Sequence, residues 1–333
     1  MTDDAYSKAG VDQADADEAV ARLVAALGTT SESKQMLASG HYANVVDIGG
    51  GIGIAITTDG VGSKLVVAET LGRWDTVGID CVAMNVNDVI CVGARPLAMV
   101  DYLAVESADP DVAEQIGIGL GKGASLAGIE IVGGELAQLG ELIRGLDLAG
   151  ACFGVVGAKD LVTGQAIETG DVVIGMPSSG LHSNGYTLAR KALETVPLDD
   201  ERLGRPLGEI LLEPTVIYSK AIVELLDSSL GGDVHGLAHI TSGGLENLLR
   251  LEADVTFEID DPLPAPPIFP LVAELGEVEP EEMRNVFNMG CGFCCVVAAS
   301  AADEVSQLLA TDHPGTRVIG RVADGPASVR VVD

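Results

Sequence analysis

Positively charged residues are few in this sequence. Its 333 residues include 19 Lys and Arg against 50 Asp and Glu, so the formal net charge is −31, and only seven of the basic residues are Lys. An acidic excess of this size repels nucleic acid and anionic membranes, and it repels polyphosphate unless glycine turns and metal ions compensate locally. The acid is spread along the chain. This even spread of acidic residues is compatible with an ordinary acidic protein. We favour a second interpretation, in which the acidic residues keep the surface hydrated in a high-salt cytoplasm, because salt at 1 M screens their mutual repulsion beyond ~3 Å.

Long apolar runs are also missing. No uninterrupted run reaches the ~20 residues that a membrane span needs, and the acidic opening Met1-Thr2-Asp3-Asp4 does not resemble a targeting leader. We therefore expect a cytoplasmic protein with neither a membrane nor a nucleic acid as partner. Because 47% of the residues are hydrophobic, the chain can bury a large core, and its length suggests two domains.

Cysteine is scarce. Six are present, and Cys291 and Cys294 form a C-x-x-C that could indicate zinc or redox chemistry. A tetrahedral zinc site needs a second such pair or a histidine pair, and neither accompanies this one. The segment 293–299 is typical of a buried strand, in which Cys acts as a small apolar residue. We interpret Cys81 and Cys91, in another apolar segment, in the same way.

The chain is organised around residues 54–65, where an apolar run ends in an acid, two glycines and a lysine. The alternation predicts a half-buried strand, and Gly60 and Gly62 supply the positive-φ or close-approach positions of a tight turn. Asp59 could then hold a divalent cation, while Lys64 and the glycine amides could take phosphate oxygens. The alternative is an ordinary turn with a solvated ion pair, and the chain contains no G-x-x-x-x-G-K-[ST] phosphate loop.

A helix predicted over 76–93 is apolar on nearly every face, which indicates burial. It nevertheless carries Asp80, Asn85, Asn87 and Asp88. An unpaired buried carboxylate costs several kcal/mol, so Asp88 must be paired, hydrogen-bonded or bound to metal. Either an internal hydrogen-bond network or a second metal or nucleotide ligand facing Asp59 would satisfy it.

A short strand at 129–132 is predicted to run straight into Gly133, Gly134 and Glu135, which places a third acid at a strand end or buried edge. Composition shifts near Ala158, so we divide the chain into domains 1–158 and 159–333. The remaining expected elements are a short leader at 6–12; an opening strand after Gly49-Gly50-Gly51; helices at 14–27, 111–127 and 214–226; strands at 97–105, 147–156, 171–176, 292–299 and 316–322; and a proline-rich connector at 262–270.

Two loops of the second half combine polar side chains with predicted helix N-termini. His182, Ser183 and Asn184 lie in the first, which could bind a sugar phosphate through hydroxyls, an amide and the helix dipole, or could simply cap its helix. His239 opens the second and could act as an acid, a base or a phosphate donor, or could be a satisfied loop histidine.

Together these loops make the chain resemble the phosphoribosylformylglycinamidine cyclo-ligase (aminoimidazole ribonucleotide synthetase) family over nearly its whole length. The resemblance is carried, in family order, by Tyr6-Ser7-Lys8-Ala9-Gly10-Val11-Asp12, Thr58-Asp59-Gly60-Val61-Gly62-Ser63-Lys64-Leu65, Asn85-Val86-Asn87-Asp88, Gly133-Gly134-Glu135, Gly180-Leu181-His182-Ser183-Asn184-Gly185-Tyr186, His239-Ile240-Thr241-Ser242-Gly243-Gly244 and Phe287-Asn288-Met289-Gly290.

The resemblance implies an α+β / α/β two-domain fold, with an N-terminal sheet domain that pairs across a homodimer into a barrel-like structure and a C-terminal α+β sandwich domain. It implies ATP-dependent ring closure of formylglycinamidine ribonucleotide to aminoimidazole ribonucleotide, with ADP and phosphate released and Mg²⁺ as cofactor. The implied catalytic residues are His239, Lys64 and Asp88, and the implied metal ligands are Asp59, Asp88 and Glu135. The implied nucleotide site is Asp59, Gly60, Gly62, Ser63, Lys64, Asn87, Asp88, Gly133, Gly134 and Glu135. The implied substrate site is His182, Ser183, Asn184, Thr241 and Gly243.

Two alternatives remain at this point. Motifs around Asp59 and Asp88 are shared across a superfamily that includes small-molecule kinases and synthases, so the chain could be another ATP-using member. Leu136 stands where family members commonly have Thr after Gly-Gly-Glu. This change leaves open a catalytically inactive structural paralogue.

Overall fold

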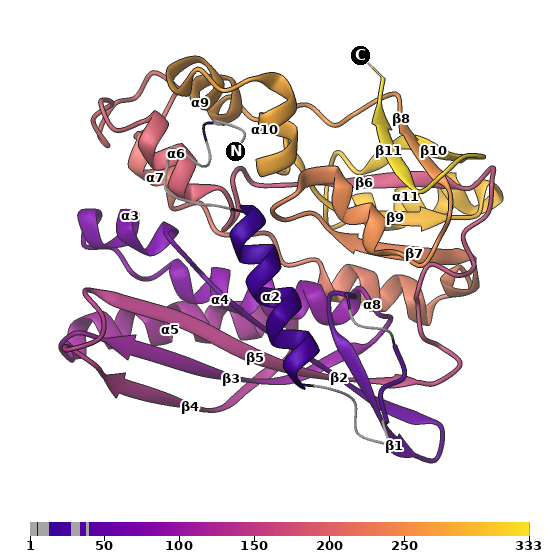
Figure 1. The fold of residues 1–333 in the computed structure, drawn as a ribbon, viewed down its shortest axis with the longest axis horizontal. Helices are drawn as coiled ribbons and strands as arrows, with labels where there is room; N and C mark the ends of the chain where they lie inside the picture. Colours follow the sequence, from indigo (N-terminus) through magenta and orange to yellow (C-terminus); the bar gives the residue numbers. More distant parts are fainter. Residues whose placement is uncertain (1–4, 6–12, 28–33, 38–39, 333) are drawn as a thin grey trace.

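The computed structural model describes residue 5 and residues 13–27, 34–37 and 40–332, and within them the chain builds two sheets flanked by helices (Figure 1). The elements of the first half are α2 Gln13–Leu27, β1 Asn44–Gly49, β2 Ile52–Gly60, α3 Lys64–Leu71, α4 Val77–Ile90, β3 Arg95–Val105, α5 Pro110–Ala127, β4 Glu130–Gln138 and β5 Leu146–Gly157. Those of the second half are β6 Val172–Pro177, α6 Tyr186–Ala192, α7 Leu207–Leu211, α8 Ser219–Asp227, η1 Gly231–Asp233, β7 Val234–His239, η2 Gly244–Arg250, β8 Thr256–Ile259, α9 Ile268–Gly276, α10 Pro280–Val286, β9 Cys291–Val297, η3 Ala299–Ala301, α11 Ala302–Ala310, β10 Arg317–Ala323 and β11 Ser328–Val331.

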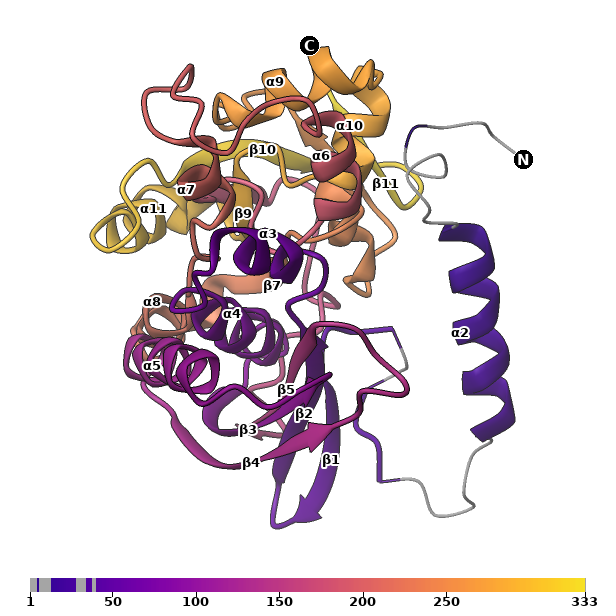
Figure 2. The same ribbon diagram turned by 90° about the vertical axis from the view of Figure 1, so that its left-hand side faces the viewer.

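The first sheet has the order β1-β2-β5-β3-β4 among the described residues, and helices α4 and α5 lie on one of its faces (Figure 2). Only β3 and β4 run parallel, and α5 makes the crossover between them. The opposite face carries Ile52, Ile56 and Tyr102, which are between 39% and 43% exposed. Within the described part of the chain, one face of this sheet is therefore covered and the other is not.

Helix α4 is buried along its entire length, as its all-round apolar sequence predicts. It packs against α5 so closely that a Cβ at Gly78 would lie 2.3 Å from the backbone nitrogen of Leu120. Glycine is required at this crossing because no side chain fits between the two backbones. The close approach fixes α4, and with it Asp80, Asn87 and Asp88, relative to the first sheet.

The second sheet has the order β11-β8-β10-β6-β9-β7 among the described residues. Every residue of β9 is buried, so Cys291, Cys294 and Cys295 pack in a core cluster, and Cys81 and Cys91 are buried on and just after α4. All six cysteines are free thiols, which confirms that they act as apolar core residues. The mixed α/β architecture in two parts confirms the coarse fold expected from the sequence.

The hydrophobic core does not divide where the sheets do. One cluster joins Val82 and Val86 of α4 to Tyr186 and Leu188 of α6 and to Phe287 after α10. The two halves therefore share buried apolar surface, and α4 lies at their junction.

Several expected elements require correction. The strand expected after the three glycines is the second strand, because β1 precedes them and Gly49, Gly50 and Gly51 form the hairpin turn with φ values of 91°, 68° and 76°. The strand expected to end at 132 continues to Gln138 because its pairing with β3 extends that far. The helix expected from 214 begins only at Ser219. Residues 6–12 lie outside the described part of the chain.

Candidate active site

Asp59 lies near the end of β2, where the chain leaves the sheet for the turn into α3. Its backbone N–H donates to Asn85 Oδ1 and its carbonyl accepts from Asn85 Nδ2, both at 3.1 Å, so α4 fixes its position. Gly62 has a φ of 69°, and a Cβ at Gly60 would lie 3.3 Å from the Leu148 carbonyl. The turn thus uses both glycine properties that the sequence predicted.

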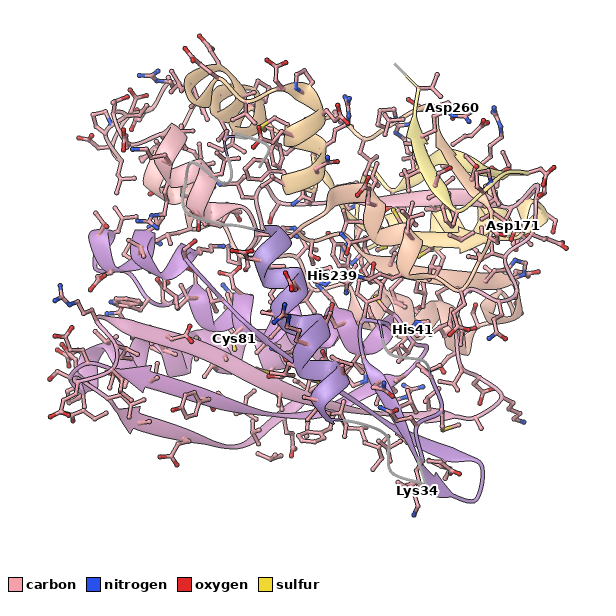
Figure 3. All side chains as sticks on the ribbon, in the orientation of Figure 1. Lys34, His41, Cys81, Asp171, His239 and Asp260 are labelled. Carbon is pink, nitrogen blue, oxygen red and sulfur yellow. The ribbon has the colours of Figure 1, made fainter. Side chains whose placement is uncertain are left out.

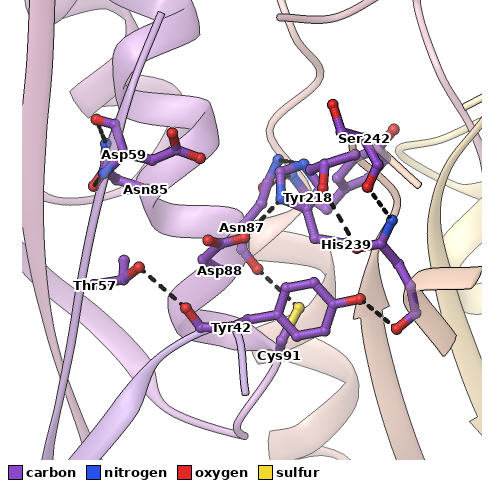
Figure 4. A network of polar contacts seen from close by, with 12 residues as sticks. Tyr42, Thr57, Asp59, Asn85, Asn87, Asp88, Cys91, Tyr218, His239 and Ser242 are labelled. Atoms are coloured by element: carbon purple, nitrogen blue, oxygen red, sulfur yellow. Dashed lines mark hydrogen bonds and ion pairs between the residues drawn. The ribbon is translucent and has the colours of Figure 1, made fainter. Parts of the chain in front are cut away.

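The surroundings of the Asp59 carboxyl group disfavour its charged form. Burial and the neighbouring charge of Asp88 raise its pKa to about 6, although a hydrogen bond from the Gly60 N–H and the positive charges of His239 and Arg250 oppose the rise. Asp59 on β2 and Asp88 on α4 therefore lie close enough for their negative charges to repel each other (Figure 4). A divalent cation placed between them would relieve that repulsion.

Asp88, on the last turn of α4, is paired with His239 at the end of β7 (Figure 4). His239 Nδ1 lies 2.9 Å from Asp88 Oδ1, and the His239 side chain is fully buried whereas that of Asp88 is 12% exposed. The pair joins the two halves of the chain, as Figure 3 shows by the place of His239 at their boundary. The hydrogen-bond network expected around Asp88 is therefore present, and its carboxylate keeps an accessible edge.

Asn87 uses its side-chain amide to hold the second half of the chain. Its Nδ2 donates to the Val216 carbonyl at 2.8 Å, and its Oδ1 accepts the Tyr218 N–H at 3.0 Å. Its Nδ2 also lies 3.5 Å from His239 Nε2. In this geometry Asn87 positions the segment before α8 beside the Asp88–His239 pair.

Lys64 is placed differently from the sequence-based expectation. Its side chain has no exposed surface, and Nζ donates to Asp80 Oδ1 at 2.9 Å, to the His182 carbonyl at 3.1 Å and to the Glu213 carbonyl at 2.6 Å. An ammonium group has three donors, and all three are engaged. Burial lowers the Lys64 pKa, while Asp80 opposes that shift. In this arrangement Lys64 fastens two loops to α4 and offers no free N–H to a phosphate.

Asp80 was not expected to carry this role. Besides Lys64, its Oδ1 accepts from the backbone N–H and the hydroxyl of Thr215, both at 2.7 Å, and from Ser183 Oγ at 3.2 Å. Its Oδ2 is buried and has no hydrogen-bond partner among the described residues. The sequence showed a buried acid in α4, but its partners lie up to 135 positions away and leave no local pattern.

The loop before α6 holds the predicted substrate residues. His182 is buried at a φ of 60°, with Nε2 accepting the Ser179 N–H at 3.2 Å. Its Nδ1 is buried without a partner among the described residues, and burial lowers its pKa well below the usual range. Asn184 is half-buried. Asn288, in a predicted motif, donates to the Gly180 carbonyl at 2.8 Å and fixes the start of this loop.

The segment after His239 forms η2 and carries groups that the sequence reasoning missed. Gly243, at a φ of 94°, donates its N–H to the Asn285 carbonyl, and Thr241 Oγ1 donates to Asn247 Oδ1 at 3.4 Å. At the end of η2, the Arg250 guanidinium lies over the Tyr42 ring, 4.8 Å from its centroid. The only available signals were one arginine and one tyrosine about 200 positions apart.

Three predicted site residues lie elsewhere. Gly133, Gly134 and Glu135 lie within β4, at the edge of the first sheet, and all are exposed. Glu135 faces Tyr102 across the ladder rather than ending a strand. The structure therefore brings Asp59 and Asp88 together and does not bring Glu135 to them within this chain. Ser63, another predicted site residue, has its Oγ 3.1 Å from Thr187 Oγ1 on α6.

A cavity of about 470 Å³ lies in the second half and does not coincide with the carboxylates. Its walls come from η2, α10 and β11 and include Phe287, Asn288 and Met289. Neither Asp59, Asp88 nor His239 lines it. The chemistry-bearing groups and this cavity thus lie in different places.

Comparison with known families places these features in context. The N-terminal domain of the AIR synthase related proteins matches residues 40–156, and the C-terminal domain matches residues 168–333. The chain belongs to the AIR synthase related family. The matched segments contain every site residue described above.

Relatives in this family extend over the same length. The chain is 48% identical to the phosphoribosylformylglycinamidine cyclo-ligase of Methanothermobacter thermautotrophicus, over 98% of this chain and 96% of that protein. It is 49% identical to the enzyme of the same name from Thermococcus kodakarensis, over 96% of each chain. The solved structure of the hydrogenase maturation protein HypE in complex with ATP superposes with a TM-score of 0.62 at 17% identity, covering 86% of this chain and 84% of that one. This last likeness shows a shared fold.

The donor set fits a magnesium ion that is completed by a ligand. Among the described residues no three His, Cys, Asp or Glu side chains converge into a ready-made metal cluster. Mg²⁺ is usually held by one or two carboxylates plus waters and substrate phosphates, so Asp59 and Asp88 match its needs without a third acid. Also in the described part, no helix is both long and apolar enough to cross a membrane.

Proposed function

We propose that this chain is an aminoimidazole ribonucleotide synthetase, which closes the ring of formylglycinamidine ribonucleotide with ATP in purine biosynthesis. The observation that carries the proposal is 40–49% identity to cyclo-ligases over nearly the whole of both chains. It is supported by the facing carboxylates Asp59 and Asp88 and by the bound ATP of a protein with the same fold. A cytoplasmic location suits such small-molecule chemistry.

The chemistry explains why a nucleotide is needed. An amide oxygen is a poor leaving group, so ATP phosphorylates it, and the internal amine then attacks the resulting imidate to close a five-membered ring. Holding the amine and the carbon in reach contributes up to ~7–11 kcal/mol because the attack is intramolecular. Neutralising the transferred phosphoryl group supplies much of the remainder.

We assign Asp59 and Asp88 as the residues that would hold a magnesium ion, whose positive charge would offset that of the carboxylates and of the nucleotide phosphates. His239 orients Asp88 through its 2.9 Å contact and lies at the junction where the reacting atoms would meet. Turn residues Gly60 and Gly62 would let the nucleotide approach the backbone closely.

For the substrate we assign His182, Ser183, Asn184, Thr241 and Gly243. The unpartnered, buried Nδ1 of His182 supports this assignment because a buried polar atom without a partner is costly, and a substrate group could satisfy it. Lys64, by contrast, is better suited to holding the substrate loop than to binding phosphate, since its three donors are engaged. We place the domain boundary at residue 158, between β5 and β6.

A homodimer paired through the first sheets would cover the surface that the described chain leaves bare. Ile52, Ile56, Leu97 and Tyr102 are between 39% and 51% exposed, and Val132 on the edge strand β4 is 61% exposed. Apolar area of this kind usually marks an interface. Pairing there could also bring Gly133, Gly134 and Glu135 to a partner's nucleotide. Light scattering tests this, and a folded, active monomer would refute it.

The acidic surface suggests a requirement for salt. With a net charge of −31, self-repulsion is strong at low ionic strength and is screened at high ionic strength. We expect activity and thermal stability to rise steeply between about 0.1 M and 2 M KCl. Equal melting temperatures at the two concentrations would refute a high-salt adaptation.

One assay tests the function itself. Purified protein, Mg-ATP and formylglycinamidine ribonucleotide should give aminoimidazole ribonucleotide, ADP and phosphate in equal amounts. A superfamily kinase would phosphorylate a substrate without closing a ring, and an inactive paralogue would turn over nothing. Either result would reject the proposal.

A further inference from the structure

Among the described residues, Lys64, the cation that the sequence expected to bind phosphate, is already fully engaged. Both the nucleotide and the ribonucleotide carry phosphate, and this protein has a net charge of −31. Lys64 is fully buried and fully hydrogen-bonded, so releasing it would leave Asp80 as an uncompensated buried charge. Within the described residues, a positive group other than Lys64 is therefore the better partner for a phosphate.

Arg250 is in a suitable place. It ends η2, the 3-10 helix that follows the His239 loop, and it is exposed. It lies over the ring of Tyr42, whose backbone carbonyl accepts from Thr57 Oγ1 on β2, the strand that carries Asp59. Contacts through Tyr42 therefore place Arg250 near Asp59, while Arg250 remains open to solvent.

Its orientation is held by an aromatic ring rather than by an acid. The guanidinium lies over the ring of buried Tyr42, and the Tyr42 hydroxyl donates to the Asn247 carbonyl at 2.9 Å, three residues before Arg250. The Tyr42 carbonyl accepts from Thr57 Oγ1, two residues before Asp59. None of the ion pairs found among the described residues involves Arg250, so its planar set of donors is available.

Arg250 is also distinct from His239, which lies in the same region. The Nδ1 of His239 is engaged with Asp88, and its side chain is fully buried. Arginine suits phosphate because its fork of N–H donors matches two phosphate oxygens and stays charged. Stacking on Tyr42 fixes the plane of that fork before the ligand arrives, which reduces the ordering cost of binding.

We propose that Arg250, oriented by Tyr42, is the phosphate-binding cation of this site and does what the sequence assigned to Lys64. The assignment rests on the proposed function for the identity of its ligands, which offer two sources of phosphate. One is the triphosphate of the nucleotide, beside the ion held by Asp59 and Asp88. The other is the 5′-phosphate of the ribonucleotide substrate.

The test compares Arg250→Met, which keeps length without charge, with Arg250→Lys, which keeps charge without the fork. Arg321→Ala is the matched control, because it also removes an exposed arginine but one that is paired with Glu258 and Asp260. Titration calorimetry with Mg-ADP and, separately, with formylglycinamidine ribonucleotide distinguishes the two phosphate sources. Steady-state KM values for both ligands and ligand-free melting temperatures complete the set.

We expect Arg250→Met to weaken one ligand by roughly 10- to 100-fold, as loss of charge-assisted hydrogen bonds does, with an unchanged melting temperature. Arg250→Lys should recover part of the affinity, and Arg321→Ala should bind both ligands like the wild type. A weaker affinity for Mg-ADP would identify the nucleotide phosphates as the partner of Arg250. A weaker affinity for the ribonucleotide would identify its 5′-phosphate.

Wild-type affinity of Arg250→Met for both ligands would overturn the assignment, whatever the enzyme's activity. A wild type that binds neither ligand would overturn both this assignment and the proposed function. A wild type that forms no aminoimidazole ribonucleotide, but loses Mg-ADP affinity on Arg250→Met, would reject the proposed function and support the role of Arg250.

Discussion

Helix α4 carries two acids in contrasting surroundings. Asp80, near its start, is fully buried and receives donors from Lys64, Thr215 and Ser183. Asp88, near its end, has His239 as its partner, retains an accessible edge and faces the like charge of Asp59. The charge of Asp80 is neutralised within the protein, whereas Asp88 and Asp59 together leave negative charge for a ligand to neutralise.

This difference separates structure from function better than burial does. Both acids lie on one buried helix, so the apolar pattern around them is the same. What distinguishes them is the number and charge of the donors supplied by distant segments. A carboxylate paired with a buried ammonium group and several hydrogen-bond donors fixes the fold, and an incompletely neutralised one marks a place for a cation.

Lys64→Met tests the Asp80 end and should have the largest effect. It leaves Asp80 as a buried charge without its cation and frees two buried carbonyls, so we expect a loss of about 3–5 kcal/mol in the free energy of unfolding. Urea denaturation without nucleotide measures it. A change below about 1 kcal/mol, with nucleotide binding abolished, would instead show that Lys64 binds the nucleotide phosphates.

Asp88→Asn tests the other end and should spare stability. The amide oxygen can still accept from His239, so unfolding should change by no more than about 1 kcal/mol. Removal of the charge should weaken the affinity for Mg-ATP more than roughly 10–100-fold. That range is typical when a residue that only supports a metal ligand by a hydrogen bond is lost. Calorimetry with Mg²⁺ present is the measurement, and wild-type affinity would remove Asp88 from the metal site.

His182→Asn sharpens the comparison through pH. The folded-state pKa of His182 lies well below its usual range because the ring is buried, so below about pH 6.5 the unfolded chain takes up a proton that the folded chain does not. Wild-type stability should therefore fall by up to about 1.4 kcal/mol per unit as pH decreases from there. Asparagine tolerates the φ of 60° and should remove that contribution.

Parallel denaturation curves for the wild type and His182→Asn at about pH 7 and pH 5.5 give the difference directly. Equal slopes for the two proteins would mean that the pKa of His182 is the same in the folded and the unfolded chain.

Ser183→Ala should have the smallest effect. Its hydroxyl donates to Asp80 at 3.2 Å and lies 2.9 Å from Thr215 Oγ1, but Asp80 keeps three other donors. We expect a loss of about 1 kcal/mol in unfolding free energy. If substrate KM rises more than tenfold while stability stays constant, Ser183 serves the ligand more than Asp80.

The sequence predicted most of what is local. The turn at Gly60 and Gly62, the burial of α4 and the core role of the cysteines all follow from short-range patterns, and the structure confirms them. The strand β1 was missed because its exposed end alternates weakly, and β4 was ended too early because Gly133 and Gly134 suggested a turn.

Pairings between distant segments could not be predicted in the same way. Lys64 meets Glu213 across 149 positions, and Tyr42 meets Asn247 across 205. No local period records such contacts, so a lysine in a glycine turn was interpreted as a phosphate ligand. The order of the motifs identified the family, but the partner of each polar side chain could be assigned only from the three-dimensional structure.

The position of α4 also determines whether the two halves of the chain can be produced as separate fragments. Its amides and acids hold residues 215–218, and its valines share a core cluster with α6 and Phe287. A fragment ending at residue 158 would keep the first sheet yet present Lys64, Asp80 and Asn87 to water beside bare apolar side chains. Such a fragment should aggregate when made alone and become soluble when the fragment from 159 onward is co-expressed. The two sheets would then behave as complementing halves of one folding unit.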